Sequence, residues 1–350
     1  MLHLLNNYYK LLFFPVKFGW SGALEDKEYF FKIPRTLKDA EADGWKRTER
    51  PPGPIPELRL YCSAGRYICP LYDAAGFVAG LQIALPVDQY ESFALKPEKK
   101  FVKWQAPVME GEAAKEYWTV TQYYVSEDSL KAGAGPHIEN GATLQDGGVY
   151  VSGLDGKLMR IPISEVELNS TDFVKQNCIP NMGTHYYYKM TPELNCEETL
   201  PWFVLTSGGV MIGTGFQVFG RLVAPEGQRD WFERPPGRAI TIPFAPRCLS
   251  EWASAYGVVS LHIYYIDKPW KIQCSSGDSA KPAPAVDRIL LNGERYATQV
   301  AETIKHHLTR SRHTFFAYSN FFNSFTHNFR IIYLVRQSFF ASPFNMPEPS

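Results

Sequence analysis

From Trp45 to Cys274 the chain consists of short apolar runs separated by glycine and proline turns. Runs of this kind, rich in aromatic and β-branched residues, are typical of β-strands. Before residue 275, only Leu37–Ala42 and Ser250–Ala255 have helical character. We therefore expect a mainly β protein, either all-β or a β-rich α+β fold. The predicted strands are Glu57–Tyr61, Phe77–Leu85, Tyr117–Val125, Gly148–Val151, Trp202–Thr206, Val210–Phe219, Ala239–Phe244 and Val258–Ile266.

Three short blocks recur in the same order along the chain, which predicts an internal repeat. They are Ile55-Pro56 with Tyr61 against Ile179-Pro180 with Tyr186, Gly76–Ile83 against Gly209–Val218, and Tyr123–Val125 against Tyr264–Ile266. We expect two related antiparallel β modules packed into one body. The alternative is that glycine-flanked apolar strands resemble one another by composition alone. A further match, Glu49–Gly53 against Glu233–Gly237, is out of order with these blocks and is interpreted as chance.

The domain organisation follows from these blocks. We predict a poorly defined N-terminal segment over 1–44, module 1 over 45–126, a connector over 127–171 and module 2 over 172–274. Residues 275–350 form an extension that begins with a linker and ends in an aromatic-rich tail. Between them, Tyr296, Val300, Ile304 and Leu308 recur every fourth residue, which predicts one amphipathic helix. The extension is expected to be helical or irregular, with disorder or a contact arm as alternatives.

The cysteines are even in number and contain no CxxC pair, which excludes a zinc ribbon or a thioredoxin-type motif. They predict three disulfides, and the simplest pairing joins neighbours along the chain: Cys62–Cys69, Cys178–Cys196 and Cys248–Cys274. The alternative is a set of buried reduced thiols. Asn169 begins an Asn-Ser-Thr glycosylation sequon.

Disulfides predict an extracellular protein. A signal peptide needs an apolar core of about 7–15 residues. The longest candidate, Leu11–Val16, is shorter and is bracketed by lysines. We therefore expect a different first segment in a secreted form, with a cytoplasmic location as the alternative. The chain has no net charge and no apolar run near the roughly 20 residues of a membrane span. It is expected to bind no nucleic acid and to have no membrane span.

The most distinctive segment runs from Cys178 to Tyr188. Its Pro180–Gly183 part is predicted to form a turn that delivers His185 to the start of an aromatic strand. His262 lies in the last strand of the same module. The alignment of the two modules places Leu60 and Thr121 at the corresponding positions of module 1. Neither side chain can replace an imidazole, so only module 2 would carry the pair.

This histidine pair is the candidate site, together with Tyr186 and Asn181. His137 could supply a third nitrogen, and Glu197 or Glu198 an oxygen, to a transition metal such as zinc, copper or iron. The other readings are general acid–base chemistry and hydrogen-bonded structural histidines. No cofactor is identified by motif, because dinucleotide, phosphate-loop and nucleophile-elbow patterns are all absent from the sequence.

The Cys178–Tyr188 segment, with Leu200–Leu205 and Gly213–Gly220, resembles a family of uncharacterised, secreted-looking invertebrate proteins. The matched positions are Cys178, Asn181, Met182, Gly183, His185, Tyr186, Pro201 and Phe203. The resemblance covers roughly Trp45–Cys274 and implies an extracellular compartment. It implies no activity. This sequence departs from the family in lacking the expected signal peptide.

Three functional hypotheses remain open. The first is an extracellular β-rich binding protein that takes an unknown small molecule or protein at an aromatic-lined site. The second is a metal-dependent enzyme that uses His185 and His262. The third is a structural or interaction protein without a small-molecule site. The absence of a catalytic motif favours the first over an enzyme.

Overall fold

The computed structural model describes residues 15–17, 30–91, 100–108, 114–126, 128–129, 148–153, 155, 157–224, 226–235 and 242–275. All of them lie in the first of two units, Met1–Pro282 and Ala283–Ser350. The predicted C-terminal helix, the aromatic tail and His137 lie outside the described residues.

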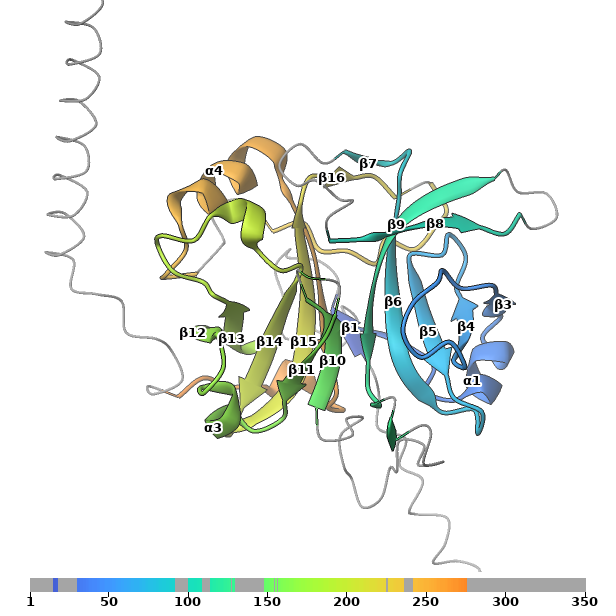
Figure 1. The fold of residues 1–350 in the computed structure, drawn as a ribbon, viewed down its shortest axis with the longest axis horizontal. Coiled ribbons are helices and arrows are strands. Elements are labelled where there is room, and N and C mark those ends of the chain that lie inside the picture. Colours follow the sequence, from blue (N-terminus) through green and yellow to red (C-terminus); the bar gives the residue numbers. More distant parts are fainter. Residues whose placement is uncertain are drawn as a thin grey trace, which may run out of the picture. The chain divides into compact units, whose positions relative to one another are not determined.

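The described part of the chain is β-rich, as the turn-separated apolar runs predict, and its strands form antiparallel sheets (Figure 1). Sheet 1 has the order β11-β10-β9-β6-β5-β4-β3, and β8 pairs with the same edge of β9 as β10 does. Its strands are β3 (Lys46–Thr48), β4 (Arg59–Cys62), β5 (Ile68–Tyr72), β6 (Val78–Pro86), β8 (Val102–Ala106), β9 (Lys115–Tyr123), β10 (Gly148–Ser152) and β11 (Leu158–Pro162).

Sheet 2 has the order β12-β13-β14-β15-β17-β1-β2. Its strands are β12 (Phe173–Ile179), β13 (Gly183–Tyr188), β14 (Trp202–Ser207), β15 (Val210–Phe219), β17 (Val258–Tyr264), β1 (Pro15–Lys17) and β2 (Phe30–Lys32). The last two come from the N-terminal segment and pair antiparallel onto β17 and onto each other. A two-stranded sheet joins β7 (Tyr90–Glu91) to β16 (Arg221–Leu222).

The helical elements are few and short. They are α1 (Leu37–Ala42), α3 (Glu165–Leu168), α4 (Arg247–Tyr256) and the 3-10 turns η4 (Cys196–Glu198) and η6 (Pro269–Lys271). The boundaries of α1 agree with the prediction, whereas α4 is longer than expected. Thr36 caps α1 by accepting a hydrogen bond from the Asp39 amide. Within the described residues, no helix has both the length and the apolar character needed to cross a membrane.

The two sheets share one strand order and one register. Across sheet 1, Leu60 of β4 lies opposite Leu71, which lies opposite Gly80, which lies opposite Tyr123. Across sheet 2, the same path runs from His185 through Leu205 and Gly213 to Tyr264. Two residues before each of these tyrosines, Thr121 and His262 occupy the same position. One residue pair from each block therefore occupies the same register position: Tyr61 and Tyr186, Gly80 and Gly213, and Tyr123 and Tyr264.

Three apolar clusters hold the sheets. The largest lies between them and includes Leu81 and Val120 of sheet 1 with Val204 and Phe216 of sheet 2. Tyr124 and Tyr265 meet there edge to face, with ring centroids 5.6 Å apart. The other two clusters cover the outer faces, where Leu249 and Ala253 of α4 pack against sheet 2. Each sheet is thus buried on both sides, which explains the nearly continuous apolar runs of β6 and β17.

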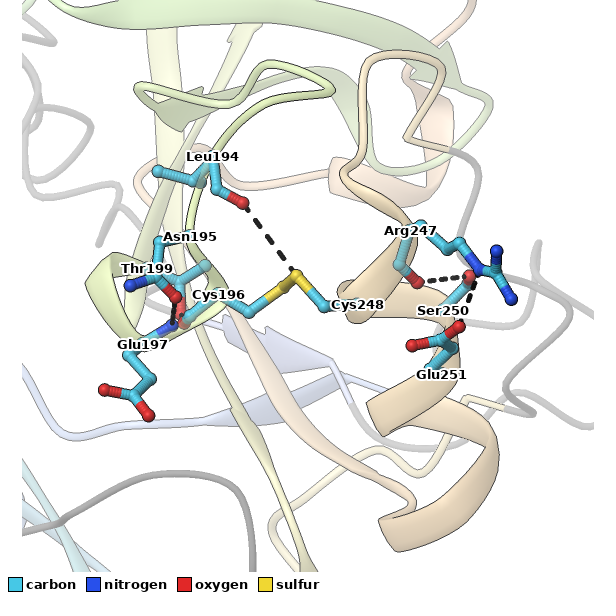
Figure 2. Close-up of a disulfide and its surroundings, with 9 residues drawn as sticks. All are labelled: Leu194, Asn195, Cys196, Glu197, Thr199, Arg247, Cys248, Ser250 and Glu251. Atoms are coloured by element: carbon cyan, nitrogen blue, oxygen red, sulfur yellow. Dashed lines mark hydrogen bonds and ion pairs between the residues drawn. A yellow bond between two sulfur atoms is a disulfide. The ribbon is translucent and has the colours of Figure 1, made fainter. Parts of the chain in front are cut away.

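The six cysteines form three disulfides, but two of the predicted pairings are wrong. Cys62–Cys69 is as expected, whereas the remaining cysteines pair as Cys178–Cys274 and Cys196–Cys248. The end of β12 lies beside the chain that follows β17, because the Asn181 amide donates to the Ile272 carbonyl at 2.9 Å. Figure 2 shows the Cys196–Cys248 bridge, which ties η4 to the first turn of α4.

Several strands were not predicted, and one predicted strand is not formed as expected. In the second half of Ala239–Phe244, residues 242–244 form a turn, and residues 239–241 lie outside the described part. The short strand β5 is uniformly buried and carries Pro70, which masks a strand pattern. The strands β1 and β2 have three residues each, too few for any periodicity.

Candidate functional site

Sheet 2 brings His185 and His262 together on its outer face. Two strands lie between β13 and β17, so in a flat sheet the two backbones would be roughly 14 Å apart. The two imidazoles nevertheless approach to 3.3 Å between their Nε2 atoms. They reach each other because Gly213 and Gly215 of β15 place no side chain on this face.

The ring of Phe203 occupies the space above Gly215. It stacks against His185 with centroids 5.5 Å apart and meets His262 edge to face at 5.1 Å. A Cβ atom at position 215 would lie 1.8 Å from this ring, so only glycine fits there. Tyr187 stacks on both Phe203 and His185, and Tyr264 stacks on His262. The pair therefore lies in an aromatic surround.

The two Nδ1 atoms face oxygen acceptors. Nδ1 of His185 lies 3.0 Å from the Gly183 carbonyl oxygen, and Nδ1 of His262 lies 2.7 Å from Oε1 of Glu233. A carbonyl and a carboxylate oxygen only accept, so in this arrangement each Nδ1 donates its proton, and the Asn177 backbone makes a further hydrogen bond with His185. The two Nε2 atoms then face each other with a single proton between them or with two opposed lone pairs. Opposed lone pairs repel unless a cation lies between them.

The three side chains are removed from water. His185, His262 and Glu233 expose 6%, 3% and 0% of their surface, respectively. Burial, reinforced by the nearby His262, lowers the pKa of His185 to about 3. His185 is therefore neutral near pH 7, which is the form in which an imidazole accepts a proton or binds a metal.

The turn before β13 sets the position of His185. Asn181 has φ of 65° and Gly183 has φ of 98°, both in the left-handed region that asparagine and glycine tolerate best. A Cβ atom at Gly183 would lie 2.8 Å from the Thr206 carbonyl oxygen. The Asn181 carbonyl accepts a hydrogen bond from the Tyr264 hydroxyl at 3.2 Å. The turn thus ties the start of β13 to β17 and aims the Gly183 carbonyl at His185.

The other predicted site residues lie elsewhere. Tyr186 points to the opposite face of the sheet, where its hydroxyl donates to Oε1 of Glu165 at 2.5 Å. Asn181 acts through its backbone. Glu197 and Glu198 are exposed in η4, and His137 lies outside the described residues. Asn169, the sequon residue, is exposed at the end of α3.

Sequence reasoning missed Glu233, the carboxylate that holds His262. Its backbone forms an isolated bridge with Ser260 of β17, with hydrogen bonds of 2.8 and 2.9 Å. The one signal that could have found it is the Glu233–Gly237 match to Glu49–Gly53, which was interpreted as chance. Among the described residues, no group of three or more His, Cys, Asp or Glu side chains could hold a metal. The two histidines supply two nitrogens that can bind a metal, Nε2 of His185 and Nε2 of His262.

Comparisons with protein-family models, with curated proteins and with solved structures find no match for this chain. The geometry of the two histidines and their partners is therefore the evidence that bears on function.

Proposed function

We propose that this chain is an extracellular, disulfide-stabilised β protein that binds a transition-metal ion between Nε2 of His185 and Nε2 of His262. The observation that carries the proposal is the 3.3 Å approach of two imidazole nitrogens whose Nδ1 atoms both face oxygen acceptors. Of the three hypotheses from the sequence, this proposal is the binding protein, with a metal ion as its ligand.

The distance suits a tetrahedral ion. Zinc lies about 2.0–2.1 Å from a histidine nitrogen. An ion at that distance from two nitrogens 3.3 Å apart has an N–metal–N angle of about 110°, the tetrahedral value. Imidazole ligands suit zinc, copper, iron and nickel, so we expect zinc or copper to bind best. Two coordination positions remain for ligands other than these histidines.

The groups behind the histidines are those that metal-binding imidazoles use. A ligating histidine almost always donates its second N–H to a carboxylate or a backbone carbonyl, which fixes the tautomer and the ring orientation. Glu233 serves His262 in this way, and Gly183 serves His185. The Glu233 carboxylate also offsets part of the charge that the ion would bring into a buried place.

The extracellular assignment rests on the three disulfides, which persist in oxidising compartments. The exposure of Asn169 is compatible with a glycan at that residue. A mass decrease after treatment with a peptide N-glycosidase, absent in Asn169→Gln, would support both. Secretion without any such decrease would support the extracellular assignment but contradict a glycan at Asn169.

The two sheets are proposed to be copies of one module. The shared strand order and register support this, and so do the glycines. A Cβ atom at Gly80 would meet the Gln122 carbonyl and a Leu71 methyl, and one at Gly213 would meet the Ile263 carbonyl and a Leu205 methyl. These partners are equivalent in the two registers. In this account β1 and β2 take the places that β10 and β11 hold in sheet 1.

The test is elemental analysis of the full chain, secreted from a eukaryotic cell and carrying no polyhistidine tag. After loading with zinc or copper and dialysis, we expect about one more ion per chain than in His185→Gln or His262→Gln. Thr121→Ala, at the position equivalent to His262, is the matched control and should keep the ion. Equal metal content in the wild type and both histidine variants, all folded by thermal melting, would contradict the proposal and leave a shared proton between the rings.

A further inference from the structure

The edge of β9 in sheet 1 has a gap. Two strands pair with this same edge. Along β9, the pairing with β8 stops at Thr119, opposite Val102, and the pairing with β10 starts at Gln122, opposite Val151. Between them, Val120 and Thr121 face no strand on this edge among the described residues. A cavity of about 340 Å³ lies here, between the start of β8, the end of β10 and the Arg50–Pro54 segment. We call it the sheet 1 pocket.

The charges that line the sheet 1 pocket have one sign. Arg50 and Lys100 line it, together with Thr119, Thr121 and Ser152. The Lys100 Nζ donates to the Thr199 carbonyl, and the Thr119 hydroxyl donates to the Val102 carbonyl. No aspartate or glutamate is among the described lining residues. The two other described cavities differ, since Glu49 and Glu57 line one and Asp88 lines the other. In a chain with no net charge, a positive hollow without carboxylates favours an anionic occupant.

Three hydrogen bonds hold the guanidinium of Arg50 in place, and they occupy only part of its N–H donors. Its Nη1 donates to the Ile55 carbonyl at 2.5 Å, and its Nη2 donates to the Pro54 carbonyl at 2.9 Å and to the Tyr123 hydroxyl at 3.1 Å. A guanidinium has five N–H donors, so these three bonds leave two for a ligand. Pro51, Pro52 and Pro54 fix the backbone of this segment.

We propose that the sheet 1 pocket binds a small organic anion, bearing a carboxylate or a phosphate group, through the Arg50 guanidinium, with the positive charge of Lys100 adding to the attraction. Its volume is at the lower end of the range for small-molecule sites. Arg50 would bind the anionic group by charge-assisted hydrogen bonds, and the hydroxyl groups beside it would orient the rest of the ligand. The proposal is independent of the metal site, which lies on the other sheet.

The test is calorimetric titration of the full chain with citrate, glucose 6-phosphate and glucose. We expect saturable binding of an anion and none of neutral glucose. Citrate binding alone would assign carboxylates, and glucose 6-phosphate binding alone would assign phosphates. Arg50→Met and Lys100→Met should each weaken the binding at least tenfold, and the second variant covers the case in which Arg50→Met disturbs the segment.

Arg47→Met is the matched control, because Arg47 is exposed on the adjoining β3 and does not line the sheet 1 pocket. It removes the same charge and should bind as the wild type does. No saturable binding of either anion would overturn the proposal. So would an equal loss in Arg47→Met, which would indicate general charge attraction.

Discussion

The outer faces of the two sheets differ at equivalent positions. In sheet 2, His185 and His262 meet under an aromatic cover, and α4 closes the face. In sheet 1, the same two positions hold Leu60 and Thr121, and a cavity with a basic lining lies beside Thr121. The strand framework therefore sets where a site can form, whereas the side chains and the covering loops decide what it binds.

The repeated Glu-Arg-Pro-Pro-Gly segment sharpens the comparison. The two copies lie at different places relative to the repeated blocks. Each copy nevertheless contacts the outer face of its sheet, at β9 in sheet 1 and at β17 in sheet 2. In sheet 1 the arginine of the segment, Arg50, bonds the Tyr123 hydroxyl. In sheet 2 its glutamate, Glu233, bonds His262. Equivalent strands thus receive a cation in one case and an anion in the other.

The largest expected effect concerns the disulfides, which close loops of very different length. Chain entropy predicts that replacing Cys178 and Cys274 by alanine lowers the free energy of unfolding by about 4–5 kcal/mol. The Cys62–Cys69 loop spans only 7 residues, and its loss should cost about 2–3 kcal/mol. Denaturant unfolding of both double variants measures the difference. Equal losses would show that loop length does not control stability here.

A second prediction concerns Gly215, a glycine at a position where the two sheets differ. The position of Gly215 in sheet 2 is occupied by Gln82 in sheet 1. Gly215→Ala should cost about 3 kcal/mol, because the new methyl group overlaps the Phe203 ring. It should also abolish metal binding by displacing that ring into the histidines. The double variant Gly215→Ala, Phe203→Ala should lose less stability than the sum of the losses in the two single variants. Strictly additive losses would contradict the overlap.

Glu233 provides a test that leaves both metal ligands in place. Glu233→Gln keeps an oxygen acceptor for His262 but removes the charge, so the metal affinity should fall about 10–100-fold. Glu165→Gln is the control, since Glu165 bonds Tyr186 and Lys175 on the other face of the same strands. Competition with a chelator of known affinity gives both values. An unchanged affinity in Glu233→Gln would show that the Glu233 charge does not contribute to metal binding.

The smallest effect should be equal in the two sheets. Tyr123 and Tyr264 occupy the same register position, and each hydroxyl makes one hydrogen bond near its site, to Arg50 or to the Asn181 carbonyl. Tyr123→Phe and Tyr264→Phe should each lower the free energy of unfolding by about 1 kcal/mol. The first should weaken anion binding and leave the metal in place. A loss of metal in Tyr123→Phe would show that the two faces are coupled.

The sequence predicts the β-rich class because glycine and proline punctuate the apolar runs. It also places His185 and His262 on strands of the same module, but it does not show that their side chains meet across the two strands that lie between them. It cannot predict the cysteine pairing, because Cys274 meets Cys178 only where the chain that follows β17 returns to the end of β12. Glu233 escapes prediction for a similar reason: it reaches His262 through an isolated bridge to Ser260, and no periodic pattern marks such a contact.

The most direct test of the account is anomalous diffraction from crystals of the zinc-loaded full chain at the zinc absorption edge. The account predicts one anomalous peak about 2.0–2.1 Å from Nε2 of both His185 and His262. It predicts no peak between Leu60 and Thr121, the equivalent place in sheet 1. Loaded crystals without a peak between the two histidines would contradict the account and show that the rings share only a proton.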